Sequence, residues 1–247
     1  FLSCGFVLEE GFPLKDLQRI VRSMADAARH AGVTIITGDT KVVERGKCDG
    51  LYVNTAGIGE MVPGIEISGD RARPGDVVLI SGSMGDHGIA IMAHRAGLEF
   101  ETEIVSDSAA LNGLVATMIR EVPGIRVLRD PTRGGLAATL NEIAHQSVVG
   151  IKLREKDIPV RPEVVGACEL LGLDPLNVAN EGKLIAICGP EDAPRLLAAM
   201  RAHDLGRDAA IIGEVVADRN GFVRMITQIG GERVVDWLAG EQLPRIC

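Results

Sequence analysis

The run Val33-Thr34-Ile35-Ile36-Thr37, followed at once by Gly38-Asp39-Thr40-Lys41, sets the fold class of this chain. Its β-branched residues predict a short strand, which we expect to end in a loop at the Gly-Asp-Thr-Lys motif. Upstream, the apolar run from Phe1 to Leu8 predicts another strand, and Pro13 opens a helix that we expect to end at Gly32. Downstream, apolar and polar residues alternate over 51–56, which predicts a third strand. The alternation of strand, helix and strand predicts an α/β fold, with mixed α+β layers.

In the rest of the chain, further strands and helices are predicted. The polar, turn-rich segment 68–76 is a candidate domain boundary. Beyond it we expect strands at 77–80, 127–128, 184–187, 211–216 and 222–226, and helices through 89–97, 109–120, 136–144 and from Pro190. The predicted domains are therefore 1–67, as the remainder of an N-terminal α/β domain, and 70–236, as a C-terminal one. Residues 237–247 are expected to form a mobile tail.

Composition limits the possible functions. The formal net charge of -8 disfavours a nucleic-acid surface, and no apolar run is long enough to span a membrane. Five cysteines are scattered without a CxxC pair, which indicates neither a disulfide framework nor a zinc site and favours the cytoplasm. The chain starts at Phe1 without a methionine, so we expect it to be part of something longer.

The first motif with chemical potential is Gly38-Asp39-Thr40-Lys41. Asp39 could hold Mg²⁺, which takes one or two carboxylates together with substrate phosphates. Lys41 could neutralise phosphate or, if desolvated, act as a base. The alternative is an ordinary Gly-Asp turn beside a solvated lysine.

Two glycine-rich connections lead from strands into helices. Ser81 to Gly88 and Asp130 to Gly135 could each present backbone N–H groups to an anion, although neither matches the dinucleotide or Walker A pattern. His87 is read as a residue that structures the turn rather than as a catalytic group. For the second connection, a tight turn capped by Asp130 or Thr132 is an equally good interpretation.

Two further places could carry reactive groups. Glu181 lies in the loop 174–183, just before an apolar strand, and would act as a base if it were buried with a raised pKa; exposed, it would only decorate a turn. Cys247 follows Pro244-Arg245-Ile246, where a thiol could be carried, altered and handed on. The alternative is a cysteine of no consequence on a frayed end.

Together these segments resemble the hydrogenase expression/formation family HypE, a branch of the PurM-like (aminoimidazole ribonucleotide synthetase-related) ATP-dependent superfamily. The resemblance runs through the whole chain in family order. It rests on Leu2–Phe6, Thr37–Val43, Ser81–Gly88, Asp130–Leu136, Ala179–Lys183 and Pro244–Cys247.

The resemblance implies a PurM-like two-domain architecture, each domain being a mixed sheet packed with helices, and a cytoplasmic homodimer. It implies an ATP-dependent carbamoyl dehydratase. The carbamoyltransferase HypF delivers a carbamoyl group to the terminal cysteine, and the carboxamide is dehydrated to a thiocyanate with ATP and Mg²⁺. The cyano group then passes to iron held by HypC and HypD and becomes a ligand of the [NiFe]-hydrogenase centre.

Carried over by motif, the resemblance implies roles for individual residues. Cys247 would accept the carbamoyl group, and Lys41 and Glu181 would deprotonate the carboxamide. ATP would be bound by Gly38, Asp39, Thr40, Gly134 and Gly135, with Asp39 also holding the metal. The family has an opening segment before Phe1 that serves ATP, Mg²⁺ and dimer contacts, so we expect this chain alone to bind Mg-ATP poorly. Two other readings stay open: another PurM-like synthetase or kinase, and a passive carrier of the cyano group.

Overall fold

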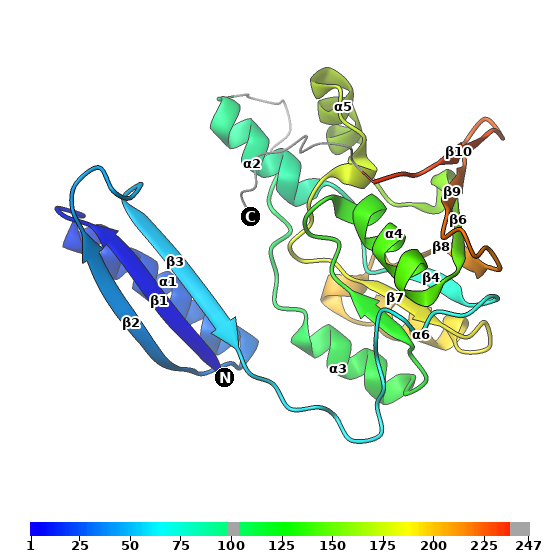
Figure 1. Cartoon of the computed structure of the whole chain (residues 1–247), viewed down its shortest axis with the longest axis horizontal. Coiled ribbons are helices and arrows are strands. Elements are labelled where there is room, and N and C mark those ends of the chain that lie inside the picture. Colours follow the sequence, from blue (N-terminus) through cyan, green and yellow to red (C-terminus); the bar gives the residue numbers. More distant parts are fainter. Residues whose placement is uncertain (98–103, 238–247) are drawn as a thin grey trace. The chain divides into compact units, whose positions relative to one another are not determined.

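The computed structural model describes residues 1–97 and 104–237 (Figure 1). The chain divides into two compact units, Phe1–Pro63 and Gly64–Cys247. They are called unit 1 and unit 2, and each is described by itself.

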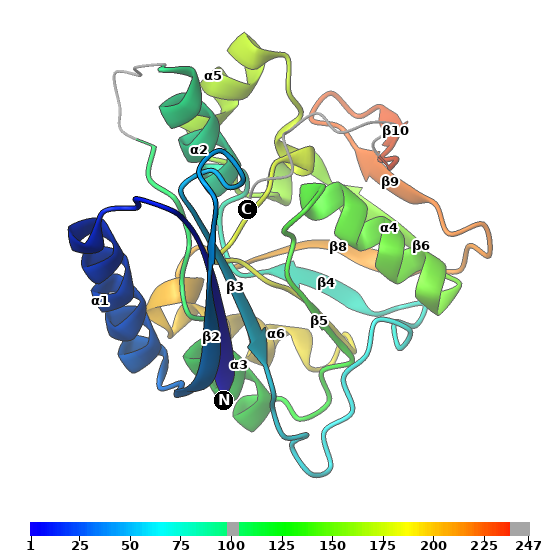
Figure 2. The same cartoon turned by 60° about the vertical axis from the view of Figure 1, so that its left-hand side comes forward.

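Unit 1 is a three-stranded sheet with one helix. It contains β1 (Leu2–Glu9), α1 (Leu14–Ala31), β2 (Ile35–Val43) and β3 (Leu51–Gly57). The strand order is β2-β1-β3, with β1 parallel to β2 and antiparallel to β3. Figure 2 shows α1 lying along one face of this sheet. The predicted strand–helix–strand–strand order is confirmed.

Helix α1 has the ends that its sequence predicts, but it contributes little core. It follows Pro13 and ends at Gly32, whose left-handed φ of 65° is accessible to glycine at low cost. No residue of α1 is buried, and among residues 1–63, all of which the structure describes, only Cys4 is buried. Among residues 1–63, therefore, most apolar side chains are at best partly buried.

The expectation that the strand ends at Gly38-Asp39-Thr40-Lys41 is wrong. Strand β2 continues to Val43, because residues 37–43 pair in parallel register with Ser3–Glu9 of β1. Gly38 is required by a close approach rather than by a turn: a Cβ there would lie 2.0 Å from the carbonyl oxygen of Cys4. Strand pairing thus outweighs the turn preference of Gly-Asp.

Unit 2 is built on a seven-stranded sheet of order β10-β9-β6-β8-β4-β7-β5, in which β6 and β9 are parallel and the other pairs are antiparallel. Its strands are β4 (Val77–Ile80), β5 (Val127–Arg129), β6 (Gly150–Arg154), β7 (Ile185–Cys188), β8 (Ala210–Val216), β9 (Val223–Ile226) and β10 (Glu232–Val234). Its α-helices are α2 (Asp86–Ala96), α3 (Asn112–Glu121), α4 (Gly135–Ser147), α5 (Pro162–Leu171) and α6 (Ala193–Arg201). Short 3₁₀ turns occur at Glu155–Asp157, Pro175–Asn177 and Asp204–Gly206.

The core of unit 2 lies on both faces of this sheet. Successive residues of β4 point to opposite faces, so Val78 and Ile80 pack with α4 while Leu79 packs with α3 and α6. A third apolar cluster joins α2 to α5 through Ile89 and Val164, and Figure 1 shows these two helices side by side. This sandwich of helices and sheet confirms the predicted fold class.

Most predicted elements of unit 2 are present. Strand Val77–Ile80 has the predicted bounds, and α2 ends at Gly97 as expected. Helix α6 begins at Ala193, so the prediction that it begins at Pro190 is wrong by three residues; Pro194 occupies its first turn instead. The elements β6, α5 and β10 were not predicted. The domain boundary expected between 67 and 70 stays a prediction, and residues 238–247 of the expected tail lie outside the described residues.

Candidate functional site in unit 2

Asn180 joins three loops of unit 2. Its side chain has no exposed surface, and its Oδ1 accepts a 2.7 Å hydrogen bond from the N–H of Gly85. Its Nδ2 donates to the carbonyls of Pro131, at 3.1 Å, and Val178, at 2.9 Å. One amide side chain therefore ties the glycine-rich connection after β4, the turn before α4 and the loop before β7 together.

Three backbone N–H groups of the connection Ser81 to Gly88 are hydrogen-bonded within unit 2 and so are not free for an anion. The N–H groups of Met84, Gly85 and Gly88 donate to Pro159, Asn180 and Ala179, at 2.9, 2.7 and 3.0 Å. The first turn of α2 also contains Asp86, whose side chain is 2% exposed and whose Oδ2 accepts a hydrogen bond from the Ser83 hydroxyl. These groups serve packing within unit 2.

The turn before α4 is packed against the same loops. Gly134 and Gly135 both have left-handed φ values, of 72° and 62°. A Cβ on Gly135 would lie 2.5 Å from the carbonyl oxygen of Leu176 and 2.6 Å from that of Val178. Only glycine fits there, so residue 135 fixes the distance between α4 and the loop that carries Glu181.

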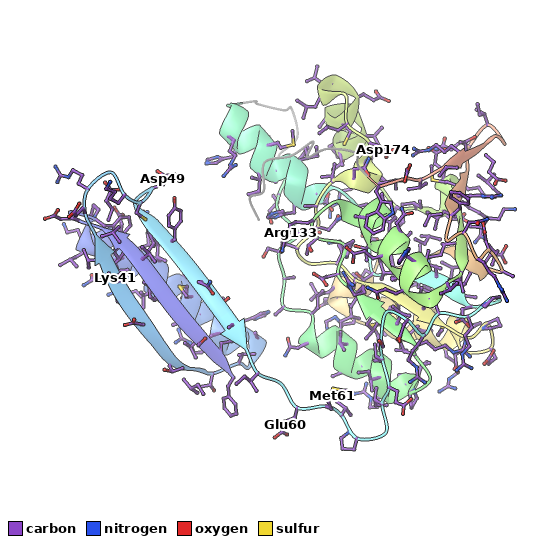
Figure 3. The ribbon with its side chains drawn as sticks, in the orientation of Figure 1. Lys41, Asp49, Glu60, Met61, Arg133 and Asp174 are labelled. Carbon is purple, nitrogen blue, oxygen red and sulfur yellow. The ribbon has the colours of Figure 1, made fainter. Side chains whose placement is uncertain are left out.

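Arg133 precedes these glycines (Figure 3) and is exposed. Among the described residues, neither the guanidinium of Arg133 nor the N–H of Gly134 has a hydrogen-bond partner. The N-terminus of α4 therefore presents one cation and one unused N–H group, which suits an anionic ligand.

The loop before β7 is held by Asp107, which lies in the segment between α2 and α3. Its Oδ1 accepts a 2.9 Å hydrogen bond from the N–H of Glu181, and its Oδ2 lies 3.2 Å from Nζ of Lys183. The Asp107 side chain is 3% exposed. Next to Asp107, His87 shares a 2.8 Å hydrogen bond between its Nδ1 and Oγ of Ser106, so this buried histidine does structure the loop, as its sequence context suggests.

A cavity of about 370 Å³ opens beside these residues. Its walls include Ser83, Asp86, Asp107, Arg161, Lys183 and Arg207. Within the part of the chain that the structure describes, three buried atoms lack any polar partner: Nε2 of His87, Oδ1 of Asn177 and Oε1 of Glu181. Oδ1 of Asp86 and Oδ2 of Asp107 accept no hydrogen bond either, but each faces a cation, Arg161 at 3.6 Å and Lys183 at 3.2 Å. Unsatisfied buried polar atoms are costly, and their concentration in this region is typical of a functional site.

The residues predicted for chemistry divide between the two units. Glu181 lies on the loop described above and is half-buried. Gly38, Asp39, Thr40 and Lys41 lie on β2 of unit 1, where Asp39 and Lys41 share one face and are exposed; Figure 3 shows Lys41 on this strand. Oδ1 of Asp39 accepts a 2.8 Å hydrogen bond from the N–H of Thr40. The predicted approach of Lys41 to Glu181 joins the two units and stays a prediction.

The described cysteines differ in their surroundings. Burial raises the pKa of the Cys168 thiol to about 11 and that of Cys188 to about 12, with nearby carboxylates adding to each shift. Cys4 is buried as well, whereas Cys48 is half-buried and its Sγ lies 3.6 Å from the carbonyl of Val7. Cys247 lies outside the described residues.

Asp107 and the tying role of Asn180 were not found from the sequence. Asn180 lies in a segment that had drawn attention for its two amides, an acid and a lysine, but its partners are 49 and 95 positions away. Asp107 lies in the short run Ser106-Asp107-Ser108, which carries no recognisable motif. Only the three-dimensional contacts identify these two residues.

Comparison with known proteins gives the family. A model described as the C-terminal domain of AIR synthase related protein matches residues 73–226, and its N-terminal counterpart matches residues 1–61. The chain is 66% identical to a carbamoyl dehydratase HypE from Azotobacter vinelandii, over all of this chain and 72% of that protein.

Two solved structures are similar over almost the whole chain. A crystal structure of the hydrogenase maturation protein HypE in complex with ATP is 55% identical with a TM-score of 0.95, over 100% of this chain and 75% of that one. A HypE–HypF complex matches at 49% identity with a TM-score of 0.92, over 96% of this chain and 77% of that one.

The two matched domains and their mixed sheets make the chain an AIR synthase related protein. Within that class it belongs to the HypE family of carbamoyl dehydratases, which are hydrogenase maturation proteins.

No helix among the described residues is both long enough and apolar enough to cross a membrane. Those same residues contain no group of three or more His, Cys, Asp or Glu side chains arranged to hold a metal ion.

Proposed function

We propose that this chain dehydrates a carboxamide carried on the thiol of Cys247 to a thiocyanate, using ATP and Mg²⁺. The observation that carries the proposal is the convergence of three family motifs on Asn180, which gathers Glu181, Gly134 and Gly135 within one unit. The ATP-bound HypE relative supports the nucleotide. Family membership supports the reaction.

The reaction needs two kinds of assistance. Mg-ATP, when bound, supplies a phosphoryl group that turns the carboxamide oxygen into a leaving group. The chain must hold the carboxamide in line and remove its two nitrogen protons as the C–O bond breaks and the C≡N bond forms. Lys41 and Glu181 are proposed to take these protons.

Glu181 suits this role because its Oε1 is buried and has no hydrogen-bond partner among the described residues. A carboxylate oxygen with a free lone pair can accept a proton without first breaking a bond. Lys41, exposed on β2, has no such pre-formed setting within unit 1. Its proposed role rests on the family motif.

The residues proposed for Mg-ATP fit that ligand. Asp39 is exposed, and Oδ1 takes only the N–H of Thr40, which leaves Oδ2 for a cation. Mg²⁺ can be held by one carboxylate when substrate phosphates and water complete its coordination shell. Gly134 and Gly135, with Arg133, are proposed to meet phosphate oxygens at the start of α4.

The partners follow the family. The HypE–HypF complex supports a HypF-type carbamoyltransferase as the donor to Cys247. We further propose that the HypC–HypD complex receives the cyano group, that the complete protein is a homodimer, and that it works in the cytoplasm.

The test separates the two steps on the complete protein. Lys41→Ala and Glu181→Ala should leave carbamoylation of the tail intact and slow the loss of water from it, because both residues are assigned to the second step only. If either variant forms thiocyanate at the wild-type rate, its assignment as a base is wrong. If carbamoylation itself fails in both, the residues serve binding rather than dehydration.

A further inference from the structure

We propose that Asp107 is a positioning residue for dehydration, which acts by fixing the backbone of Glu181 through one carboxylate oxygen and the side chain of Lys183 through the other. The inference rests on the proposed role of Glu181 as a base. Asp107 touches neither the tail nor the nucleotide in this account.

Three contacts hold the loop against Asp107. Oδ1 accepts the N–H of Glu181 at 2.9 Å, and Oδ2 faces Nζ of Lys183 at 3.2 Å. Gly182, between them, lies so close that an added Cβ would be 1.7 Å from the carbonyl oxygen of Asp107. Three consecutive residues are therefore fixed by one aspartate.

Burial makes these contacts stiff. The side chains of Asp107 and Lys183 are only 3% and 14% exposed, so water competes little for either charge. On the other side, the Lys183 stem packs against Gly82, whose hypothetical Cβ would lie 3.0 Å from Cε. This packing limits the movement of the lysine stem beside Asp107.

The segment that carries Asp107 is itself anchored to the site. Ser106, its neighbour, is hydrogen-bonded through Oγ to His87 of the glycine-rich connection at 2.8 Å. The segment Ser106-Asp107 thus connects the backbone of Glu181 to His87, and so joins two of the three loops that Asn180 holds together. A base displaced by about 1 Å can lose on the order of a hundredfold in rate.

Asp76 supplies a matched control. It is also buried, with one oxygen accepting a backbone N–H, that of Arg73 at 2.8 Å, and the other paired with Arg126. It precedes β4, whereas the site lies beyond the other end of that strand. Asp76→Ala should destabilise the fold about as much as Asp107→Ala while leaving the dehydration rate of the folded protein unchanged.

The experiment measures loss of water from the carbamoylated tail in the complete protein with ATP. Asp107→Ala should slow dehydration about 10- to 100-fold, with carbamoylation and the KM for ATP unchanged. Asp107→Asn keeps an acceptor for the Glu181 N–H but loses the charge that faces Lys183, so it should recover part of that rate, and it also covers the case in which the alanine variant does not fold.

Combination with Glu181→Ala decides whether Asp107 acts through Glu181. The double variant should be no slower than Glu181→Ala alone, because a positioning residue has no effect once its base is gone. If the rate losses of the two single variants multiply in the double variant, or if Asp107→Ala dehydrates at the wild-type rate, the inference is overturned. The role of Glu181 as the base is unaffected by either result. A wild-type rate in Glu181→Ala would instead overturn the proposed base, and with it the positioning role.

Discussion

Removal of the Asn180 side chain should release the three loops that it joins. Asn180→Ala leaves the buried N–H of Gly85 without an acceptor and the carbonyl of Val178 without its donor. The carbonyl of Pro131 is less affected, because it keeps the 3.1 Å hydrogen bond from the backbone N–H of residue 180.

The cost follows from these three contacts. Each lost hydrogen bond contributes about 1 kcal/mol, and a buried donor left unsatisfied adds roughly 1 to 2 kcal/mol. The total is about 4 kcal/mol, which for a domain of this size lowers the Tm of unit 2 by roughly 10 °C. Asn141→Ala is the matched control: this buried asparagine donates to Ala137 and Val235, both at 2.9 Å, and leaves no N–H group orphaned. Its loss should cost about 2 kcal/mol.

Calorimetry of the two variants gives the comparison, and hydrogen exchange locates the change. The amide of Gly85 should exchange much faster in Asn180→Ala than in Asn141→Ala. Dehydration should fall only in the former, because Asn180 ties the loop of Glu181 to the neighbouring loops and Asn141 does not. Equal melting temperatures for both variants, or an unchanged Gly85 amide, would refute the idea that Asn180 ties the site together.

Further predictions concern Gly135, the two buried cysteines and the strands of unit 1. Gly135→Ala should destabilise unit 2 by well over the ~1 to 2 kcal/mol expected of Gly172→Ala, which has a similar left-handed φ but open space around it; equal thermal shifts would contradict the packing argument. Cys168 and Cys188 should resist iodoacetamide in the folded protein near neutral pH, and rapid labelling of either would show that its burial is wrong. Because the pKa of both thiols is raised, the folded state favours their neutral forms. Their contribution to the free energy of unfolding is complete below pH 9.0 and is lost as the pH rises through about 11 and 12, which denaturant titration across that window can check. Amides of β1 to β3 should exchange faster than those of β4, since unit 1 buries only Cys4 whereas β4 lies between two strands in the core of unit 2; similar protection would contradict this.

Local patterns were enough to predict much of the fold. Pro13 and Gly32 mark the ends of α1, and the apolar run Val77–Ile80 gives a buried strand with the right bounds. The prediction that the strand ends at the Gly-Asp-Thr-Lys motif was wrong because its glycine does not form a turn. Gly38 makes room for the carbonyl of Cys4 on the neighbouring strand, and pairing with β1 carries β2 through Lys41.

The site was predicted less completely, for a physical reason. Glu181 stood out because it lies in a polar loop before a strand, which is a local signal. Asp107 lies 74 positions from the Glu181 N–H that it accepts, and Gly85 lies 95 positions from Asn180. Hydrogen bonds at such separations depend on how the sheet brings its loops together, so residue spacing along the chain does not predict them.

Mass spectrometry of the tail peptide tests most directly whether Cys247 carries the reacting group. The complete protein would be incubated with ATP, Mg²⁺ and HypF with its carbamoyl donor, next to variants in which Cys4, Cys48, Cys168, Cys188 or Cys247 is replaced by alanine. We expect a carbamoyl adduct on Cys247 that loses the mass of one water only when ATP is present. Of the five variants, only Cys247→Ala should lack the adduct. An adduct that persists in Cys247→Ala, or one that never loses water with ATP, would contradict this expectation.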